Sequence, residues 1–502
     1  MSKARVAIIG AGPAGLTAGY LLTNANVPVA IFEGDPQYVG GISKTATYKG
    51  YHFDIGGHRF FSKSQEVEDL WSEILPDDML VRPRSSRILY RNQFFNYPLK
   101  AGEALTKLGI VESMRCGFSY IWARLFPVRK PRSFEDWVRN KFGHRLFSIF
   151  FKTYTEKVWG MSCKEISADW AAQRIKGLSL TTAVLAALFP KRKARSGGKV
   201  VKSLIDSFRY PRLGPGMMWD ACAAKVKASG GTLEMGRRVT ACRYDSSAQM
   251  WTVTSQDTGG REYTTEAEHV ISTAPVRELC KMLQPGVSKA TTHAAEQLKY
   301  RDFITVVLIL KDRSAFSDNW IYVHDPSVMV GRVQNFKSWS PEMVPDPDTT
   351  CYGLEYFCFE QGTGLWSYSD ERLEQLGREE IVKLGLARSE DILDSHVVRQ
   401  RKAYPVYDDA YAEHLVTIRT DLEERFPSLH LVGRNGMHKY NNQDHSMMTA
   451  MLCVKNILAG ERVYDLWRVN EDAEYHESGE AGASASGLRQ VPKRLETAKA
   501  ES

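Results

Sequence analysis

The stretch at residues 6–15 reads VAIIGAGPAG. Its first four residues are an apolar run typical of a short buried strand, and the segment PAGLTAGYLLTNA that overlaps its end places apolar side chains at helical spacing. Gly10 suits a tight turn, Gly12 lets a ligand approach the backbone, and Gly15 lets helix and strand pack closely. This order predicts a Rossmann unit whose helix N-terminus, which includes Ala14, points free N–H groups at phosphates.

An acidic residue completes this unit. The second apolar run, VAIFE, ends in Glu33, eighteen residues after Gly15. A carboxylate at that distance is placed to accept hydrogen bonds from a ribose. Because three glycines and an acid fall in register with two predicted strands, we interpret the segment as a dinucleotide-binding site and not as a structural glycine turn.

Length and composition are those of a soluble globular protein. The 502 residues suffice for two or three domains, and the hydrophobic and charged shares are 43% and 25%. No run of about 18 apolar residues is present, which argues against a membrane-spanning helix. VAIIG is too short for the apolar core of a signal peptide, so we expect a cytoplasmic protein. The eight cysteines form no CxxC pair, so we expect neither disulfides nor a metal site.

Much of the formal net charge of +7 is local, in KRKARSGGKVVK (191–202) and VRKPR (128–132). Such runs are either solvated loops or patches that attract anions, for example an acidic membrane face or a phosphorylated substrate. The apolar segment TAVLAALFP stands just before the first run. The sequence therefore leaves open a peripheral membrane contact through residues 182–202. We expect no nucleic acid partner.

Two further glycine motifs follow Glu33, in GGIS and FDIGGHRFFS. Their notable residues are Gly40, Gly41, Ile42, Gly56, Gly57 and His58. The pattern resembles the FAD-binding flavoprotein superfamily of amine oxidases, phytoene desaturases, protoporphyrinogen oxidases and UDP-galactopyranose mutases. The resemblance implies that the glycine pair follows the pyrophosphate and ribityl chain, and that the GGH loop lies beside the isoalloxazine ring. It also implies that the backbone of Val239, in GRRV, meets the adenine.

A polar cluster near the C-terminus adds a second wall to this expected FAD site. HKYNNQDHSMMTAM, residues 438–451, leads into a segment with the pattern of a buried helix that ends at Gly460. LVGRNG (431–436) resembles the strand and turn that bring this helix to the flavin. The helix mouth offers unpaired N–H groups and a positive dipole end, which would stabilise reduced flavin. The residues so assigned to FAD are Gly433, Arg434, Asn442, Gln443, Asp444, His445 and Ser446.

The expected fold class is α/β, with a discontinuous, glutathione-reductase-like Rossmann-type FAD-binding domain and an inserted α+β substrate domain. β-type patterns between 232 and 275 and a short apolar run at 431–433 supply the later pieces of the first domain. The expected boundaries are 1–75, 205–280 and 428–465 for the FAD-binding domain, and 76–204 and 281–427 for the substrate domain. Residues 466–502 form a polar tail in which we expect disorder.

Several motifs narrow the resemblance to the eukaryotic-type UDP-galactopyranose mutases. They are NQDHS after GRNGMHKY, GGHRFFS, NYPL, FKTYTEKVWG with ADWAAQR, FRYPRLGPGMMW, WIYVHDPSVMVGRVQNFKSWSP and AYPVY. The likeness touches the chain from residue 5 to about 465. There are two departures: the tyrosine stands two residues closer to NQDHS than in those mutases, and GGIS lacks the arginine common in amine oxidases.

In that family two arginines from separate segments clamp a substrate diphosphate, and by position these are Arg174 and Arg332. A guanidinium suits phosphate oxygens bidentately and stays charged at any working pH. Trp170 stands one helical turn before Arg174, and Tyr404 and Tyr440 resemble tyrosines that reach the same phosphates. The resemblance implies a nucleotide-sugar mutase. By that resemblance the arginines would stabilise the leaving nucleoside diphosphate, while N5 of the reduced flavin, beside His58, would attack the anomeric carbon. NAD(P)H would serve only as the reductant.

An alternative stays open at this stage. An oxidoreductase of the protoporphyrinogen oxidase, desaturase or amine oxidase type would share the FAD shell and use an apolar pocket built from residues 76–204. The polar cluster around the flavin argues against a third possibility, a flavin-binding protein without catalytic activity. The sequence does not indicate an oligomeric state.

Overall fold

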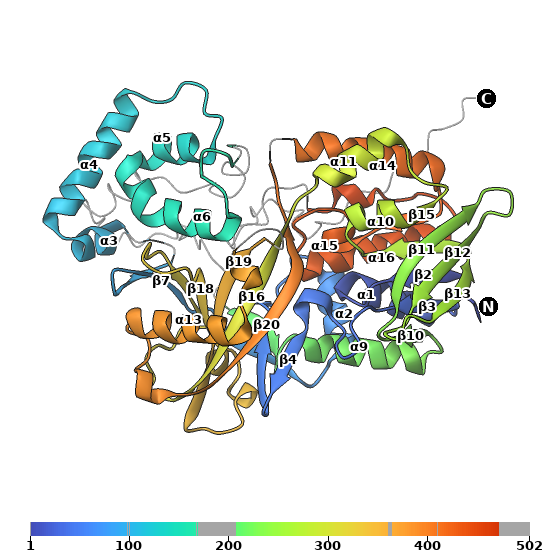
Figure 1. Cartoon of the computed structure of the whole chain (residues 1–502), viewed down its shortest axis with the longest axis horizontal. Helices are drawn as coiled ribbons and strands as arrows, with labels where there is room; N and C mark the ends of the chain where they lie inside the picture. Colours follow the sequence, from blue (N-terminus) through green and yellow to red (C-terminus); the bar gives the residue numbers. More distant parts are fainter. Residues whose placement is uncertain are drawn as a thin grey trace, which may run out of the picture.

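The computed structural model describes residues 2–166 except Pro98 and Lys100, residue 168, and residues 207–359, 364–408 and 410–470. Figure 1 shows a Rossmann part at one end of the molecule, a mixed sheet in the middle, and a group of helices beyond the far end of that sheet. Among the described residues, every helix is too short or too polar to cross a bilayer.

The Rossmann sheet assembles from strands that stand far apart in the sequence. Its order is β10, β3, β2, β14, β21, and each neighbouring pair is parallel. β2 and β3 are buried along their whole length, as expected where helices cover both faces of a parallel sheet. The bounds are β2 (Val6–Ile9), β3 (Val29–Phe32), β10 (Thr232–Glu234), β14 (His269–Ser272) and β21 (Leu429–Leu431). The sheet thus joins the start, the middle and the end of the described chain.

Helices α1 (Pro13–Asn24), α9 (Gly216–Ala228) and α16 (Gln443–Ala459) pack on this sheet, and α1 contacts both of the others. α16 is buried on nearly every side and ends at Gly460 in the left-handed conformation, as its glycine predicted. The last strand differs from the prediction at 431–433, because β21 ends at Leu431. Gly433 already begins the short helix α15 (Gly433–Gly436), and its φ of +79° is incompatible with an extended strand.

A second sheet, in the order β1, β13, β12, β11, β15, packs beside the Rossmann sheet. Its centre is an antiparallel meander of β11, β12 and β13, where the sequence alternates between apolar and polar residues. The bounds are β1 (Ser2–Lys3), β11 (Arg238–Asp245), β12 (Met250–Gln256), β13 (Glu262–Ala267) and β15 (Leu283–Gln284).

The mixed sheet runs in the order β20, β16, β19, β18, β17, β7, β8, and only the β17–β7 pair is parallel in this described sheet. β16 is buried from Tyr300 to Leu310 and is almost entirely apolar from Phe303 onward, as expected for an interior strand of a sheet that is covered on both faces. The bounds are β7 (Ser86–Tyr90), β8 (Gln93–Asn96), β16 (Tyr300–Lys311), β17 (Trp320–Val323), β18 (Arg332–Asn335), β19 (Thr349–Cys358) and β20 (Ile392–Pro405).

Further helices and two short antiparallel strand pairs complete the fold. The helical group at the upper left of Figure 1 consists of α3 (Ala101–Leu108), α4 (Ile110–Leu125), α5 (Phe134–Phe147), η2 (Ser148–Lys152) and α6 (Thr153–Trp159). The remaining helices are α2 (Gln65–Ile74), α10 (Val276–Met282), α11 (Lys289–Gln297), α12 (Phe336–Trp339), α13 (Asp370–Lys383) and α14 (Tyr411–Arg425). A hairpin pairs β4 (Thr45–Tyr48) with β5 (Tyr51–Asp54), and a two-stranded antiparallel ladder pairs β6 (Met79–Pro83) with the distant β9 (Ser207–Pro211).

The packing differs in two places from the domain boundaries expected above. α11 and α14 stand within 281–427, yet their buried residues belong to the apolar core of the Rossmann part. The expected tail begins at 466, whereas Leu466 and Val469 are buried against α16 because both are apolar. Residues 471–502, the rest of that tail, lie outside the described residues. The eight cysteines are all buried free thiols.

Candidate functional site

Two glycine loops face each other at the end of β2. Gly10 has a φ of +94°, and a Cβ there would lie 2.2 Å from Thr273 Oγ1. A Cβ at Gly15 would lie 1.9 Å from the Gly10 carbonyl oxygen, so only glycine fits both positions. Gly12 differs, because the nearest atom to its Cβ position is the Gly41 Cα at 3.9 Å. Gly12 and Gly41 therefore line a slot of bare backbone at the N-terminus of α1.

The second loop is fastened to the first. The Gly40 N–H donates a hydrogen bond to the Ala11 carbonyl at 2.8 Å, and Gly41 begins the short turn that contains Ile42. The Cδ1 atom of Trp219 lies 3.0 Å from the Cβ position of Gly40, and its buried Nε1 has no hydrogen-bond partner among the described residues. A bare slot with a buried donor beside it and a helix N-terminus at its end fits a pyrophosphate.

Glu33 follows β3 at one side of this slot. Its carboxylate accepts hydrogen bonds from the Ala11 N–H at 2.7 Å and from the Asp35 N–H at 2.9 Å. Each oxygen accepts one of these bonds and keeps a second lone pair for a ribose hydroxyl. Burial raises the pKa of Glu33 above its ordinary value. The Arg237 N–H donates to the Glu33 carbonyl at 2.7 Å, which brings the segment that leads to Val239 next to this end of the slot.

The C-terminal segment closes the same site from the other side. The Gly433 N–H donates to the Thr449 hydroxyl at 3.0 Å, and a Cβ at Gly433 would lie 3.1 Å from the Ala14 Cβ. The amide of Gln443 donates to the Arg59 carbonyl at 2.9 Å. Through these contacts the start of α16 meets the glycine loop and the GGH loop, although α16 begins more than 380 residues after either loop.

The N-terminus of α16, residues 442–446, which we call its mouth, is polar and buried. Asn442 is the N-cap residue, and its N–H donates to His445 Nδ1 at 3.3 Å. Gln443, Asp444, His445 and Ser446 are each less than 8% exposed. Gln443 Oε1 and Asp444 Oδ1 are buried without a hydrogen-bond partner in the described part of the chain. Buried acceptors of this kind are costly unless a ligand or water satisfies them, so this mouth fits a cofactor with hydroxyl or N–H donors.

Three functional groups converge at Gly56, whose φ is +90°. A Cβ at Gly56 would lie 3.7 Å from His58 Cε1, 3.7 Å from the Tyr404 hydroxyl and 3.8 Å from Arg332 Nη2. These groups come from the GGH loop, β20 and β18. At Gly57 a Cβ would lie 3.0 Å from Gln334 Nε2. The absence of a side chain at Gly56 therefore leaves one point within reach of an imidazole, a phenol and a guanidinium.

His58 is a neutral imidazole in this setting. Burial, followed by the charges of Arg434 and Arg332, lowers the pKa of His58 to about 3. Its Nδ1 lies 3.0 Å from the Gly56 carbonyl oxygen, which only accepts hydrogen bonds. Nδ1 therefore carries the proton and Nε2 is the acceptor nitrogen.

Arg332 is held by a buried carboxylate. Its Nε donates to Glu355, which is fully buried and also accepts from Gln334 Nε2 at 2.8 Å. Gln334 Oε1 accepts in turn from Trp339 Nε1 at 2.9 Å, so the chain of partners is continuous. Burial alone would lower the pKa of Arg332, but Glu355, together with Tyr154 and Tyr404, more than offsets this and holds the pKa above its ordinary value. Arg332 therefore stays charged, with its terminal nitrogens on the side of Gly56 and Tyr404.

Two tyrosines and a second arginine stand next to Arg332. The rings of Tyr404 and Tyr440 are nearly parallel, with centroids 5.6 Å apart and planes at 15°. The Arg434 Cζ lies 5.3 Å from the first centroid and 5.1 Å from the second. Arg434 donates to the Asn441 carbonyl at 2.8 Å and to the Ala403 carbonyl at 3.1 Å, which fixes its place between the two segments. Burial raises the pKa of Tyr404, so its hydroxyl is a neutral donor.

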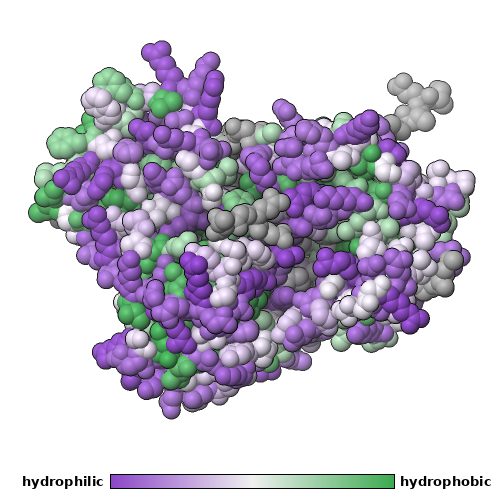
Figure 2. Space-filling view, viewed as in Figure 1, coloured by the Kyte–Doolittle hydropathy of each residue, from purple (hydrophilic) through white to green (hydrophobic). Residues whose placement is uncertain are grey.

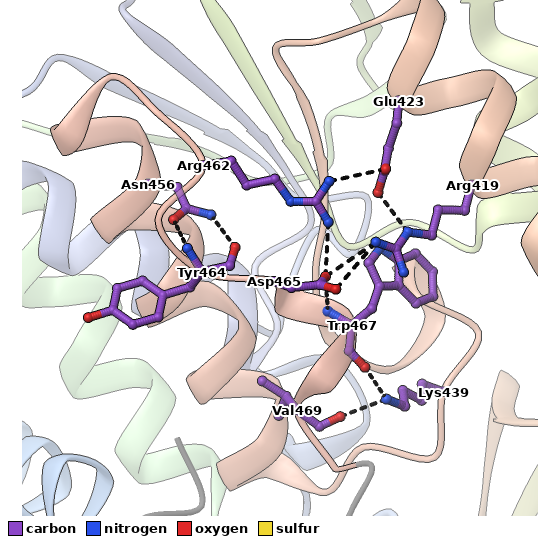
Figure 3. Close-up of polar contacts among 9 residues, drawn as sticks. All are labelled: Arg419, Glu423, Lys439, Asn456, Arg462, Tyr464, Asp465, Trp467 and Val469. Atoms are coloured by element: carbon purple, nitrogen blue, oxygen red, sulfur yellow. Dashed lines mark hydrogen bonds and ion pairs between the residues drawn. The ribbon is translucent and has the colours of Figure 1, made fainter. Parts of the chain in front are cut away.

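A clamp outside the site holds the loop that carries Tyr440 (Figure 3). Lys439 Nζ donates to the Trp467 carbonyl at 2.6 Å and to the Val469 carbonyl at 2.7 Å. Asp465 pairs with Arg462 at 3.0 Å and with Arg419 at 3.3 Å, which ties the segment after α16 to α14. Residues 464–469 thus hold the backbone of the loop next to Tyr440 in place.

The structure does not place every residue that the sequence suggested. Trp170 and Arg174 lie outside the described residues, as do residues 182–202. Sequence reasoning also missed several groups: Glu355, Tyr154, Trp320, Arg59, Arg84 and Arg301. The sequence does single out Glu355, because it is the lone acid in the apolar strand CYGLEYFC. The others gave none, because their contacts join segments that are far apart in the chain: Arg59 and Arg84 both lie over the Trp320 ring, with Cζ at 5.4 and 5.3 Å from its centroid.

This fold and the glycine-lined slot define a flavoprotein of the amine oxidase class. The family profile of flavin containing amine oxidoreductases matches residues 13–411, so the chain belongs to that family. Family membership implies FAD as the cofactor, and the slot and the polar mouth of α16 fit it. The α/β fold expected from the sequence is confirmed, with its parallel Rossmann sheet and a mixed substrate sheet.

The chain is also similar to three named proteins. A dTDP-fucopyranose mutase from Escherichia coli is 27% identical over 176 residues, which cover 33% of this chain and 44% of that enzyme, less than half its length. The structure of a reduced UDP-galactopyranose mutase superposes with a TM-score of 0.75 at 21% identity, over 91% of this chain and 94% of that one. A putrescine oxidase superposes with a TM-score of 0.60 at 16% identity, over 92% and 100%.

Proposed function

We propose that this protein is an FAD-dependent nucleotide-sugar mutase, which interconverts the six-membered and five-membered ring forms of a sugar joined to a nucleoside diphosphate. The observation that supports this best is that His58, Tyr404 and Arg332 each have an atom 3.7–3.8 Å from the Cβ position of Gly56. A guanidinium and a phenol at one point suit phosphate oxygens. The two relatives named as mutases agree with the proposal.

The residues that would hold FAD are those of the slot and the helix mouth. Gly12 and Gly41 would lie along the pyrophosphate, Glu33 would accept from the ribose of the adenosine, and Val239 would meet the adenine. The start of α16, with Gln443 and Asp444, would face the ribityl chain and the ring. When bound and reduced, the flavin supplies a nucleophilic nitrogen, N5, for the anomeric carbon of the sugar.

The protein's own groups would act on the diphosphate. Arg332 is charged and pre-aimed by Glu355, so it can hold the leaving diphosphate without first reorganising. The neutral hydroxyl of Tyr404 would donate to the same oxygens, and so would the hydroxyl of Tyr440. From the sequence, we propose Arg174 as the second arginine and Trp170 as its neighbour. The diphosphate leaves and returns on the same molecule, so the overall reaction needs no oxidant.

His58 would sit beside N5 of the flavin and shape that face of the reacting centre. Because its pKa is lowered to about 3, it carries no charge at neutral pH. Nδ1 is occupied by the Gly56 carbonyl at 3.0 Å, so Nε2 can only accept a hydrogen bond. We propose that it orients a donor of the bound ring or of the sugar, and that it does not act as an acid.

The charges distinguish this proposal from an amine oxidase. Arg332 and Arg434 both lie beside Tyr404, whereas Glu355 is the acid paired with Arg332. A positively charged amine would meet a net positive charge beside the tyrosine pair and would be repelled. An oxidoreductase with an anionic substrate remains the second candidate, because the family profile is that of oxidoreductases.

The test uses the holoprotein, reduced with dithionite under argon. UDP-galactose and dTDP-fucose are added separately, and formation of the five-membered ring isomer is followed by NMR. We expect conversion without net consumption of reductant. Arg332→Ala should keep its FAD and lose roughly hundredfold or more in kcat/KM. The control Arg313→Ala removes a partner of buried Asp391 elsewhere in the protein and should react normally. No isomer with either sugar, together with peroxide formation from an anionic reduced substrate in air, would establish the oxidoreductase instead.

A further inference from the structure

Helix α4 has its apolar side chains on the outer face and its small or polar ones on the inner face, which is the reverse of a surface helix of a globular protein. Its inner side, toward α5, is small or polar: Cys116 is 2% exposed, and the Ser119 hydroxyl accepts from the Arg145 N–H at 3.0 Å. Its outer side is apolar, with six side chains 53–71% exposed. They are Val111, Met114, Phe118, Ile121, Trp122 and Leu125. Because these positions are three or four residues apart, they form one stripe along the helix.

The contact with α5 fixes the rotation of this stripe. Gly143 of α5 has a φ of +80°, and a Cβ there would lie 2.7 Å from the Tyr120 backbone nitrogen. The Glu112 carboxylate pairs with Arg145 from the same side, at 3.1 Å for its second oxygen. The two backbones are in direct contact at this point. α4 therefore does not turn its apolar stripe inward without losing both contacts.

The stripe continues at both ends of the helix. Ile110 is 80% exposed at the start, and Phe126 and Val128 are 63% and 41% exposed after the end. In all, nine of the fifteen exposed large apolar side chains among the described residues stand between 110 and 128. Figure 2 shows hydrophobic side chains gathered at the left edge of the molecule, over α4. A patch of this size marks a surface that contacts something other than water.

The charges next to the stripe are almost all positive. Between residues 110 and 132, Glu112 is the one acid, and Arg145 already engages it. The five basic residues are Arg115, Arg124, Arg129, Lys130 and Arg132. Asn140 holds the loop that carries the last three, because its side chain bonds both the N–H and the carbonyl of Val128 at 2.9 Å. Hydrophilic side chains project at the loop between α4 and α5 in Figure 2.

We propose that α4 and the loop 126–132, the α4 surface, bind the surface of a bilayer that contains anionic lipids. The helix has 16 residues, which is too short to span a bilayer and suits one that lies in the interface with its apolar side among the acyl chains. Arg129, Lys130 and Arg132 meet the lipid phosphates. A second copy of this chain fits less well, since two such surfaces would bring like charges together.

The test is co-sedimentation of the full-length holoprotein with vesicles. We expect binding to vesicles of phosphatidylcholine with phosphatidylglycerol, weaker binding to phosphatidylcholine alone, and loss of the difference at high salt. The triple variant Phe118→Gln, Trp122→Gln, Leu125→Gln should lower the partition coefficient by at least roughly tenfold. The variant Arg129→Gln, Lys130→Gln, Arg132→Gln should lower it by a similar factor for the anionic vesicles only. All these side chains are on the surface, so flavin content and melting temperature should not change.

The matched control is Val416→Gln on α14, where the side chain is 65% exposed and far from α4 in Figure 1. It should bind vesicles like the wild type. Three outcomes overturn the proposal. In the first, the wild type does not sediment with either kind of vesicle. In the second, the triple variant sediments as fully as the wild type. In the third, light scattering shows a wild-type dimer that the triple variant converts to a monomer, which assigns the surface to a second copy.

Discussion

Arg332 and Glu355 face each other across β18 and β19, and their side chains form an ion pair whose carboxylate is fully buried. The pairing register sets this contact, and Gln334 on β18 adds a second hydrogen bond to the same carboxylate. A buried acid so engaged positions the arginine, and its loss leaves a buried charge without compensation.

The first prediction concerns this pair. Glu355→Leu should lower the free energy of unfolding by roughly 3–5 kcal/mol, because it leaves Arg332 buried and unpaired. The double variant Arg332→Met, Glu355→Leu should recover most of that loss, while nucleotide-sugar binding stays abolished. Chemical unfolding and calorimetric titration with UDP measure the two effects. If the double variant were no more stable than Glu355→Leu, the loss would have to come from packing and not from charge.

The second prediction concerns the space at Gly56. Gly56→Ala would place a methyl group between His58, Tyr404 and Arg332, and would strain a backbone with a φ of +90°. We expect the affinity for UDP to fall at least tenfold while FAD stays bound. A left-handed backbone conformation costs an alanine on the order of 1–2 kcal/mol, and the methyl group also takes up space in the substrate site. Gly230→Ala is the matched control, with a φ of +85° in open space. Equal UDP affinity in both variants would mean that the point at Gly56 is not part of the substrate site.

The third prediction concerns the cofactor. Gly15→Ala would bring its methyl group to within 1.9 Å of the Gly10 carbonyl oxygen, so the turn and helix α1 would have to separate. We expect this variant to be purified with little or no flavin absorbance. Gly34→Ala, where no atom lies within 4 Å of the new methyl group, should be as yellow as the wild type. A fully loaded Gly15→Ala protein would place the flavin elsewhere.

The fourth prediction concerns pH. Burial lowers the pKa of His438 to about 4, and its side chain is 0% exposed. Its Nε2 donates to the Val406 carbonyl at 3.3 Å, so the folded protein holds it neutral. The unfolded chain takes up the proton near pH 6.5, so stability is full above that pH and falls as pH decreases toward 4, by roughly 3 kcal/mol for this residue.

The comparison for this prediction is His438→Gln, whose amide can donate to the same carbonyl. Denaturant unfolding at neutral pH and near pH 4.5 gives the loss of stability for each protein. The variant should lose less than the wild type over this interval. An identical loss in both would show that His438 titrates normally in the folded state and that other buried groups cause the acid sensitivity.

The sequence alone was sufficient for the Rossmann unit. Gly10, Gly15 and Glu33 act over short distances along the chain, where backbone geometry and a single strand–turn–helix unit decide the conformation. The buried helix with its polar mouth at residues 442–446 was equally local, and it ends at Gly460 as predicted. The resemblance of short motifs then indicated which ends of the chain meet.

Other features required the tertiary structure. The place of Arg332 depends on Glu355, and that partner follows from strand register, which a motif does not contain. The packing of α11 and α14 into the Rossmann core also departed from boundaries drawn along the sequence, because apolar faces pair by fit and not by order. The apolar outer side of α4 has the same helical spacing as a core-facing stripe, so the pattern itself does not state which way it points.

The dinucleotide fold, its flavin-type glycine motifs and the helix that closes them therefore follow from the residues alone, since each is set by conformational preferences of neighbouring residues. The meeting of His58, Tyr404 and Arg332 at Gly56 and the choice of the α4 face that is left exposed do not follow from them. Those outcomes depend on contacts between segments that are far apart in the chain, and such contacts are chosen by packing and burial over the whole fold.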